Sequence, residues 1–137
     1  MSNFEKNFEQ AINNAKRLTD KILIDGKLIS AQTNNKIPVI NPSTGDNIGS
    51  APQCNKDDVN IAVESAHKAF QKWKKIPARE RGKMVAAGAK RLEERKSEIE
   101  TLLSLDTGNA LRTQAIPETG ASIELTNMFA GLSGELK

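Results

Sequence analysis

Cys54 and His67 could take part in chemistry, but each stands apart from the partners that this chemistry requires. Cys54 follows Pro52 where a strand pattern gives way to a helix pattern, and His67 is the one histidine of the chain. A nucleophilic thiolate needs an adjacent base and a group that orients it, so the sequence argues against a catalytic role for Cys54. One cysteine and one histidine also exclude a zinc site of ordinary ligand count.

Asp106 is the third candidate, because it occupies an unfavourable position. It lies in Leu105-Asp-Thr-Gly-Asn109, where a helical pattern ends. A carboxylate at a helix C-terminus opposes the helix macrodipole, and such a placement often reflects a capping bond, a bound cation or an interface. A plain turn-forming aspartate is the simpler alternative.

The sequence lacks the glycine-rich motifs that usually mark a dinucleotide-binding site. The sequence contains neither G-x-G-x-x-G nor G-x-x-x-x-G-K-[ST], the two glycine-rich turns that cradle phosphates between a strand and a helix. The residues therefore predict no catalytic side chain and no cofactor-binding side chain within this chain.

The elements expected to position these residues begin with a helix and short strands. Apolar residues at spacings of three and four predict an amphipathic N-terminal helix from Phe4 to Leu18. Asp25-Gly26 between two apolar runs indicates a hairpin within residues 22–29. Pro42 and Gly45 then predict a turn between strands at 36–40 and 48–51. We expect residues 21–52 to form one small antiparallel patch of sheet.

Helices account for the rest of the chain. Asn55 is a suitable N-cap for a helix that ends near Lys75, and its apolar stripe consists of Val59, Ala62, Val63, Ala66, Phe70 and Trp73. A helix from Pro77 to Thr107-Gly108 and a last helix at about 117–130 follow. The expected fold class is helix-dominated α+β, with residues 1–20 as an amphipathic helix and residues 21–137 as one body.

Composition limits the other possibilities. Only 37% of the residues are hydrophobic and 4% aromatic, so we expect the core to be completed by something outside this chain. No apolar run is long enough to span a membrane and no signal peptide is visible, which predicts a cytoplasmic protein without a membrane partner. Residues 68–96 hold 11 basic and 3 acidic side chains, a run that invites a nucleic-acid hypothesis. A solvated helix face is the preferred interpretation of that run.

Six short motifs, in order and at suitable separations, resemble the N-terminal portion of the NAD(P)-dependent aldehyde dehydrogenase family. They are Ile24-Asp-Gly-Lys27, Ile40-Asn-Pro-Ser-Thr-Gly-Asp46, Asp58-Val-x-x-Ala-Val63, Ala66-x-x-Ala-Phe-x-x-Trp73, Arg81-Gly-Lys-Met84 and Leu105-Asp-Thr-Gly-Asn109. The resemblance covers residues 21–137. It implies that this segment is an incomplete, N-terminal part of a Rossmann-like α/β coenzyme-binding domain.

The resemblance also implies an activity. Members of the family oxidise an aldehyde to a carboxylic acid with NAD or NADP, using a cysteine nucleophile and a glutamate base. Those residues and the dinucleotide site fall outside this chain, and Cys54 does not align with the nucleophile. We therefore expect an oxidoreductase and a homo-oligomer only when the protein is complete, and a catalytically inactive chain when it is isolated.

One family feature falls within the chain. Many members hold a monovalent cation, sodium or potassium, with backbone carbonyls just before the Asn-Pro turn and with the aspartate of the Leu-Asp-x-Gly motif. The matching residues are Val39, Ile40 and Asp106. A hard cation prefers such oxygen ligands and would offset the unfavourable position of Asp106. A further ligand of the family site lies outside this chain.

Two other functions stay open as alternatives. The chain could be a stand-alone protein-interaction module derived from the same family, which would use its exposed apolar helix faces to bind a partner. A nucleic-acid binder built on residues 68–96 ranks last, because Glu80, Glu93 and Glu94 interrupt the basic run.

Overall fold

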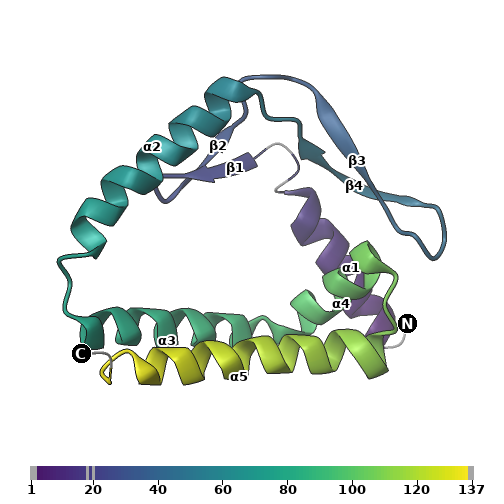
Figure 1. The fold of residues 1–137 in the computed structure, drawn as a ribbon. Coiled ribbons are helices and arrows are strands. Elements are labelled where there is room, and N and C mark those ends of the chain that lie inside the picture. The colour runs from purple at the N-terminus through teal and green to yellow at the C-terminus, as the bar shows by residue number, and fades with distance from the viewer. Residues whose placement is uncertain (1–2, 18, 20, 136–137) are drawn as a thin grey trace.

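The computed structural model describes residues 3–17, 19 and 21–135, except for the side chains of Asn3 and Phe4 (Figure 1). Leu18 and the Phe4 side chain, both part of the predicted first apolar stripe, lie outside the described residues. In chain order the elements are α1 (Asn3–Lys16), β1 (Lys21–Ile24), β2 (Lys27–Ser30), β3 (Lys36–Ile40), β4 (Asn47–Pro52), α2 (Lys56–Trp73), α3 (Ala78–Glu94), α4 (Lys96–Thr107), the π-helix η1 (Leu111–Ala115) and α5 (Ile116–Leu132). The helix-dominated α+β class is confirmed.

The strands form two antiparallel pairs, β1 with β2 and β3 with β4, in separate sheets. The predicted Asp25-Gly26 turn is confirmed, and both residues have the positive φ that a tight hairpin requires. The antiparallel strands expected within residues 21–52 are present, but they form two separate pairs rather than one sheet. In the loop between the pairs, the Gln32 N–H donates to Asp58 of α2 rather than to a strand, so the chain leaves the first sheet before β3 begins.

The predicted helix ends are confirmed, but the long helix from Pro77 to Gly108 is two helices. Asn55 caps α2, and Gly108 ends α4 in the left-handed conformation with φ +74°. The chain turns at Arg95, where φ is −111° and ψ is 14° and the N–H bonds to the Leu92 carbonyl. This break lets α3 pack along α5 while α4 packs against α1.

Helices α3 and α5 lie side by side along one edge of the molecule, and α2 runs along another (Figure 1). The contact between α3 and α5 is close because Gly82 of α3 faces the end of α5. There the Ala130 carbonyl and Ser133 leave no space for a larger residue at position 82. Ala89, Ile123 and Ala130 are buried in or beside this layer. Small residues therefore set the spacing of the two helices.

Much of the large apolar surface lies outside the core. The α2 stripe that the sequence predicted is exposed, with Val63 63% and Phe70 53% accessible, and α5 exposes Phe129 to 63%. The buried apolar residues are mainly small ones, and even Leu105 and Ile123 keep 4% and 5% of their surface accessible. The structure thus leaves apolar helix faces without a covering layer. None of the described helices is long and apolar enough to cross a membrane.

Asp58 joins α2 to the preceding loops. Asp58 is 3% exposed, and its carboxylate accepts hydrogen bonds from the backbone N–H groups of Gln32 and Asn55, both at 3.0 Å. The Asn55 side chain accepts in return from the Asp58 N–H at 2.9 Å, which completes a capping box. No local pattern in the sequence indicates the bond between Asp58 and Gln32.

Asp58→Ala is expected to lower the free energy of unfolding by about 2 kcal/mol, because two part-buried N–H groups lose their acceptor. Urea denaturation followed by circular dichroism measures the loss. Asp57→Ala is the matched control, since Asp57 lies in the same first turn but is exposed. Its loss should stay below about 0.5 kcal/mol. Equal losses in the two variants would contradict the role given to Asp58.

Candidate functional site

The structure keeps Cys54 and His67 apart. Cys54 is exposed just before the N-cap of α2, whereas His67 lies in the second half of that helix, with Nε2 3.1 Å from Nε2 of Gln71. At 1.5 Å per residue the helix separates the two by roughly 18 Å. Among the described residues no group of three or more His, Cys, Asp or Glu side chains could hold a metal ion.

The turn after β3 is organised by Asn41, which is 8% exposed. Its N–H donates to the Asp46 carbonyl at 2.9 Å, and its own carbonyl accepts from the Gly45 N–H at 2.8 Å. Its side-chain Oδ1 accepts from the Ser43 N–H at 2.9 Å. Gly45 has φ +78°, as the sequence predicted for this reversal. The Asn41-Pro42 turn is therefore closed by both backbone and side-chain bonds.

The end of α4 packs on this turn. A Cβ added at Gly108 would lie 2.9 Å from Cγ of Pro42 and 3.1 Å from Oγ of Ser43. The Gly108 N–H donates to the Ser104 carbonyl at 3.0 Å, which closes the helix. Two motifs that are far apart in sequence are thus in direct contact.

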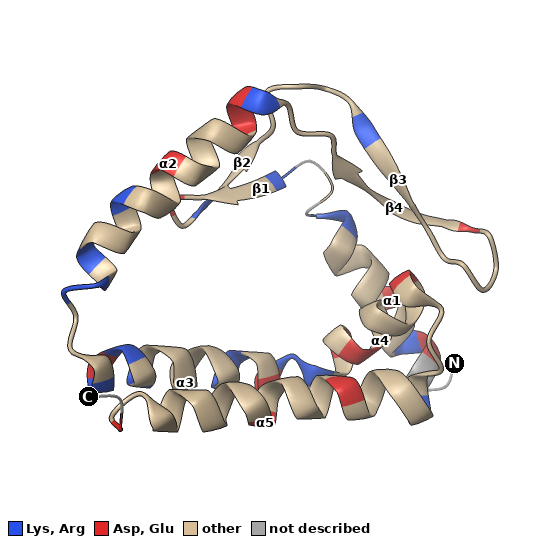
Figure 2. Ribbon diagram, in the orientation of Figure 1, with Lys and Arg blue, Asp and Glu red and all other residues tan. Residues whose placement is uncertain are grey.

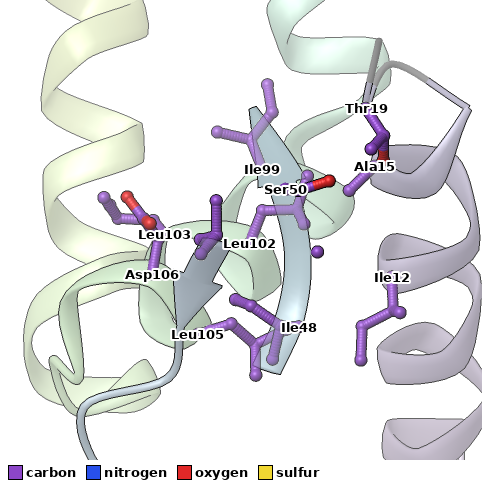
Figure 3. Close-up of a pocket in the computed structure, with 12 residues that line it drawn as sticks. Ile12, Ala15, Thr19, Ile48, Ser50, Ile99, Leu102, Leu103, Leu105 and Asp106 are labelled. Atoms are coloured by element: carbon purple, nitrogen blue, oxygen red, sulfur yellow. The ribbon is translucent and has the colours of Figure 1, made fainter. Parts of the chain in front are cut away.

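A cavity of about 390 Å³ lies between α1, the second strand pair and α4 (Figure 3). Asp106 is on its α4 wall, Ile48 and Ser50 are on β4, and Ile12 is on α1. The complete lining is Ile12, Ala15, Thr19, Val39, Ile48, Gly49, Ser50, Ile99, Leu102, Leu103, Leu105 and Asp106. Asp106 contributes the carboxylate of an otherwise largely apolar surface.

Of the three predicted cation ligands, Val39 and Asp106 line this cavity and Ile40 does not. The direction of the Ile40 carbonyl nevertheless follows from a hydrogen bond of its neighbour. Because a trans peptide is planar, its N–H and C=O point in opposite directions. The Asn41 N–H points to Asp46, on the β4 side, so the Ile40 carbonyl points away from β4 toward the open edge of the sheet.

Asp106 has no cationic neighbour in the part of the chain that the structure describes. The last turn of α4 contains no basic residue, and no described side chain forms a hydrogen bond or ion pair with the Asp106 carboxylate. Asp106 is exposed to solvent, and its negative charge lies at the negative end of the helix dipole. The available donors are hard oxygen atoms, which suit a sodium or potassium ion.

The basic run at residues 68–96 is distributed over α2, the linker and α3 (Figure 2). Local ion pairs along these helices involve Lys68 with Glu64, Lys83 with Glu80, Arg91 with Glu94 and Lys96 with Glu93. Such pairs on exposed helix faces agree with the solvated-face interpretation of the run.

Glu98 of α4 lies where this helix packs on α1, and its pKa is lowered. Its carboxylate accepts from Nε and Nη2 of Arg95 at 3.0 Å and 2.7 Å, and this bonding holds the pKa below 4.5; Asn14 of α1 adds a weaker hydrogen bond. A folded-state pKa below the unfolded value gives stability that is present above the unfolded pKa and is lost as the pH falls through the folded one.

Glu98→Gln should therefore flatten the loss of stability below pH 4.5. The effect is at most about 1 kcal/mol, because the Arg95 side chain is largely exposed and its interaction is screened by solvent. Arg95→Gln should produce the same flattening, since it removes the cause of the shift. Urea midpoints measured across the acid range test this, and an unchanged acid limb in both variants would refute it.

Comparison with known proteins agrees with this geometry. The model of the aldehyde dehydrogenase family matches residues 28–137. Phenylacetaldehyde dehydrogenase of Pseudomonas fluorescens is 34% identical over 122 residues, which are 88% of this chain and 24% of that protein. The chain therefore spans about a quarter of the length of the curated relatives that it matches.

Solved structures share the fold. HpcC of Thermus thermophilus superposes with a TM-score of 0.89 at 23% identity, over 96% of this chain and 25% of that one. Betaine aldehyde dehydrogenase of Staphylococcus aureus, solved in complex with NAD⁺, gives a TM-score of 0.84 at 28% identity over 93% of this chain and 26% of that one. The resemblance first seen in six motifs is confirmed, and the chain belongs to the aldehyde dehydrogenase family.

Proposed function

We propose that residues 21–137 form the N-terminal part of the coenzyme-binding domain of an NAD(P)-dependent aldehyde dehydrogenase, with helix α1 packed against it. The enzyme would oxidise an aldehyde to a carboxylic acid. The NAD⁺ in the Staphylococcus aureus structure supports a nicotinamide coenzyme. We further propose that the complete enzyme is a cytoplasmic homo-oligomer.

The observation that carries this proposal is the combination of a family fold with uncovered apolar faces. The chain superposes on a quarter of a dehydrogenase, yet Val63 of α2 and Phe129 of α5 are each 63% exposed. Apolar helix faces exposed in this way mark surfaces that pack against another part of a protein or against a partner. The remaining part of a dehydrogenase, which would also supply the catalytic cysteine and glutamate, is the layer that we propose.

Isolated residues 1–137 should produce no NADH or NADPH above the buffer rate when mixed with either coenzyme and an aldehyde such as phenylacetaldehyde. Intact Staphylococcus aureus betaine aldehyde dehydrogenase with betaine aldehyde serves as the positive control for the assay. Turnover by the isolated chain that disappears in Cys54→Ser would refute the proposal, because Cys54 would then be a nucleophile.

Gel filtration separates this proposal from the interaction-module alternative. An isolated part of an enzyme with exposed apolar helix faces should form aggregates of no defined size. It should also bind a dye that reports exposed apolar surface. A discrete, stable dimer whose formation hides that surface would favour the module, because the apolar faces would then have a partner of their own.

The proposal includes a sodium or potassium site formed by the carbonyl oxygens of Val39 and Ile40 and by the Asp106 carboxylate. Support comes from the cavity that Val39 and Asp106 both line and from the position of the Asp106 carboxylate at the negative end of α4. A bound cation would neutralise that charge and tie α4 to the β3 turn.

In the complete enzyme, Asp106→Ala should weaken the broadening of the sodium NMR signal that the protein causes, because the carboxylate ligand of the proposed site is removed. Asp46→Ala is the matched control, since Asp46 is an exposed carboxylate in the adjacent turn and its backbone carbonyl is retained. Equal broadening by the unsubstituted protein and Asp106→Ala would remove the cation site from the proposal.

A further inference from the structure

We infer that a small polar cavity between α1, the turn after β3 and α4 binds ordered water, which connects that turn to the helix. The cavity has a volume of about 150 Å³. Four polar side chains line it, those of Asn41, Ser43, Thr101 and Ser104. The inference depends on these uncharged residues and not on the proposed cation site.

The inner part of the cavity is shielded from bulk solvent. Asn41 is 8% exposed, Thr101 6% and Leu105 4%, and the side chains of Phe8 and Leu111 complete the wall. A polar group at such a depth is costly unless it finds a hydrogen-bond partner. Donors and acceptors that the protein leaves unused here therefore favour a bound polar molecule.

Asn41 supplies donors from the turn. Its Oδ1 accepts from the Ser43 N–H at 2.9 Å, so the other terminal atom of the side chain is the amide nitrogen Nδ2. None of the described residues accepts a hydrogen bond from Nδ2. This nitrogen is open to a molecule the size of water, because Oγ1 of Thr119 is the one enclosed side-chain polar atom without a partner in the described part of the chain.

Thr101 and Ser104 supply acceptors from α4. Oγ1 of Thr101 donates to the Ser97 carbonyl at 2.8 Å, and Oγ of Ser104 donates to the Asn109 carbonyl at 2.7 Å. Each hydroxyl has thereby used its one hydrogen, and its lone pairs are left to accept. The cavity thus presents donors on the turn and acceptors on the helix.

This combination of groups selects water over an ion. A cation needs acceptors and an anion needs donors, whereas water donates two hydrogen bonds and accepts two. No charged side chain is among the described residues that line the cavity. A buried water makes about three hydrogen bonds and needs a cavity of roughly 10–15 Å³, so this cavity has room for more than one.

A crystal structure of the complete protein tests the inference directly. We expect ordered solvent within hydrogen-bond distance of Nδ2 of Asn41 and Oγ1 of Thr101. Thr101→Val replaces the hydroxyl with a methyl group of similar size and should remove the solvent molecule bound at position 101. A cavity without ordered solvent, or one filled by a side chain from elsewhere in the protein, would overturn the inference.

Urea denaturation provides a second measurement with a matched control. Thr126 of α5 makes the same bond within its helix, from Oγ1 to the Ser122 carbonyl at 2.7 Å, but it does not line the cavity. Both valine variants lose this local bond, and Thr101→Val also loses a bond to water. The urea midpoint of Thr101→Val should therefore fall further than that of Thr126→Val.

Thr101→Ser keeps the hydroxyl and should keep both the ordered solvent and most of the urea midpoint, including where Thr101→Val does not fold. Loss of the solvent from folded Thr101→Ser would contradict the inference. So would an equal or smaller fall of the midpoint in Thr101→Val than in Thr126→Val, because the Thr101 hydroxyl would then have no partner in the cavity. The membership of the chain in its family is unaffected by either result.

Discussion

Gly82→Ala should lower the free energy of unfolding by roughly 2–3 kcal/mol, the scale of an overpacked interior. A Cβ at position 82 would lie 2.0 Å from Oγ of Ser133 and 2.5 Å from the carbonyl oxygen of Ala130. The Ser133 side chain can rotate away, but the Ala130 oxygen belongs to the helix backbone. Helices α3 and α5 must therefore move apart, and their shared contacts weaken along the whole layer.

Gly88→Ala is the matched control in the same helix. No atom lies within 4 Å of a Cβ built at Gly88, so alanine adds helix propensity without a clash. Its free energy of unfolding should rise by up to about 1 kcal/mol. Urea denaturation of both variants measures the two effects, and a loss of stability in both would show that position 82 has no special contact with α5.

Gly108→Ala should be the other strongly destabilising change, with a loss of about 3 kcal/mol, the sum of a conformational and a packing cost. The left-handed conformation at φ +74° costs a residue with a Cβ about 1–2 kcal/mol. The contact with Pro42 at 2.9 Å adds an overpacking cost of similar size. Because this contact joins α4 to the β3 turn, the variant should also lose the sodium-dependent rise in unfolding midpoint.

Gly45→Ala separates the conformational cost of the left-handed backbone from the cost of the packing clash. Gly45 has φ +78°, but a Cβ there would meet no atom within 4 Å. The variant should lose only the conformational part, about 1–2 kcal/mol. Differential scanning calorimetry in sodium and in choline measures both quantities. Equal losses at positions 45 and 108 would contradict the proposed close packing of α4 on the turn.

The sequence predicted those features that depend on neighbouring residues. Asn55 as N-cap, Gly108 as helix end and Asp25-Gly26 as hairpin turn all follow from local backbone chemistry, and each is confirmed. The break at Arg95 has no such signal, since neither proline nor glycine stands there. Helix α3 packs mainly on α5 and α4 mainly on α1, and no local pattern reveals this difference.

The candidate site likewise has some features that the local sequence indicates and others that depend on the tertiary fold. The unfavourable position of Asp106 could be read from the sequence, but its cavity shared with Val39 depends on the tertiary fold. The family resemblance, and not residue spacing, suggested that these residues belong together. Pro42 and Gly45 were predicted as turn residues, whereas the side-chain bond by which Asn41 closes the turn was missed.

The central claim is that this chain serves as the N-terminal part of an aldehyde dehydrogenase. The most direct test joins residues 1–137 to the segment that follows the matching region in Staphylococcus aureus betaine aldehyde dehydrogenase, and measures NADH formation with betaine aldehyde and NAD⁺. We predict turnover by the joined protein and none by either part alone. A joined protein that folds but neither binds NAD⁺ nor forms NADH would contradict the claim.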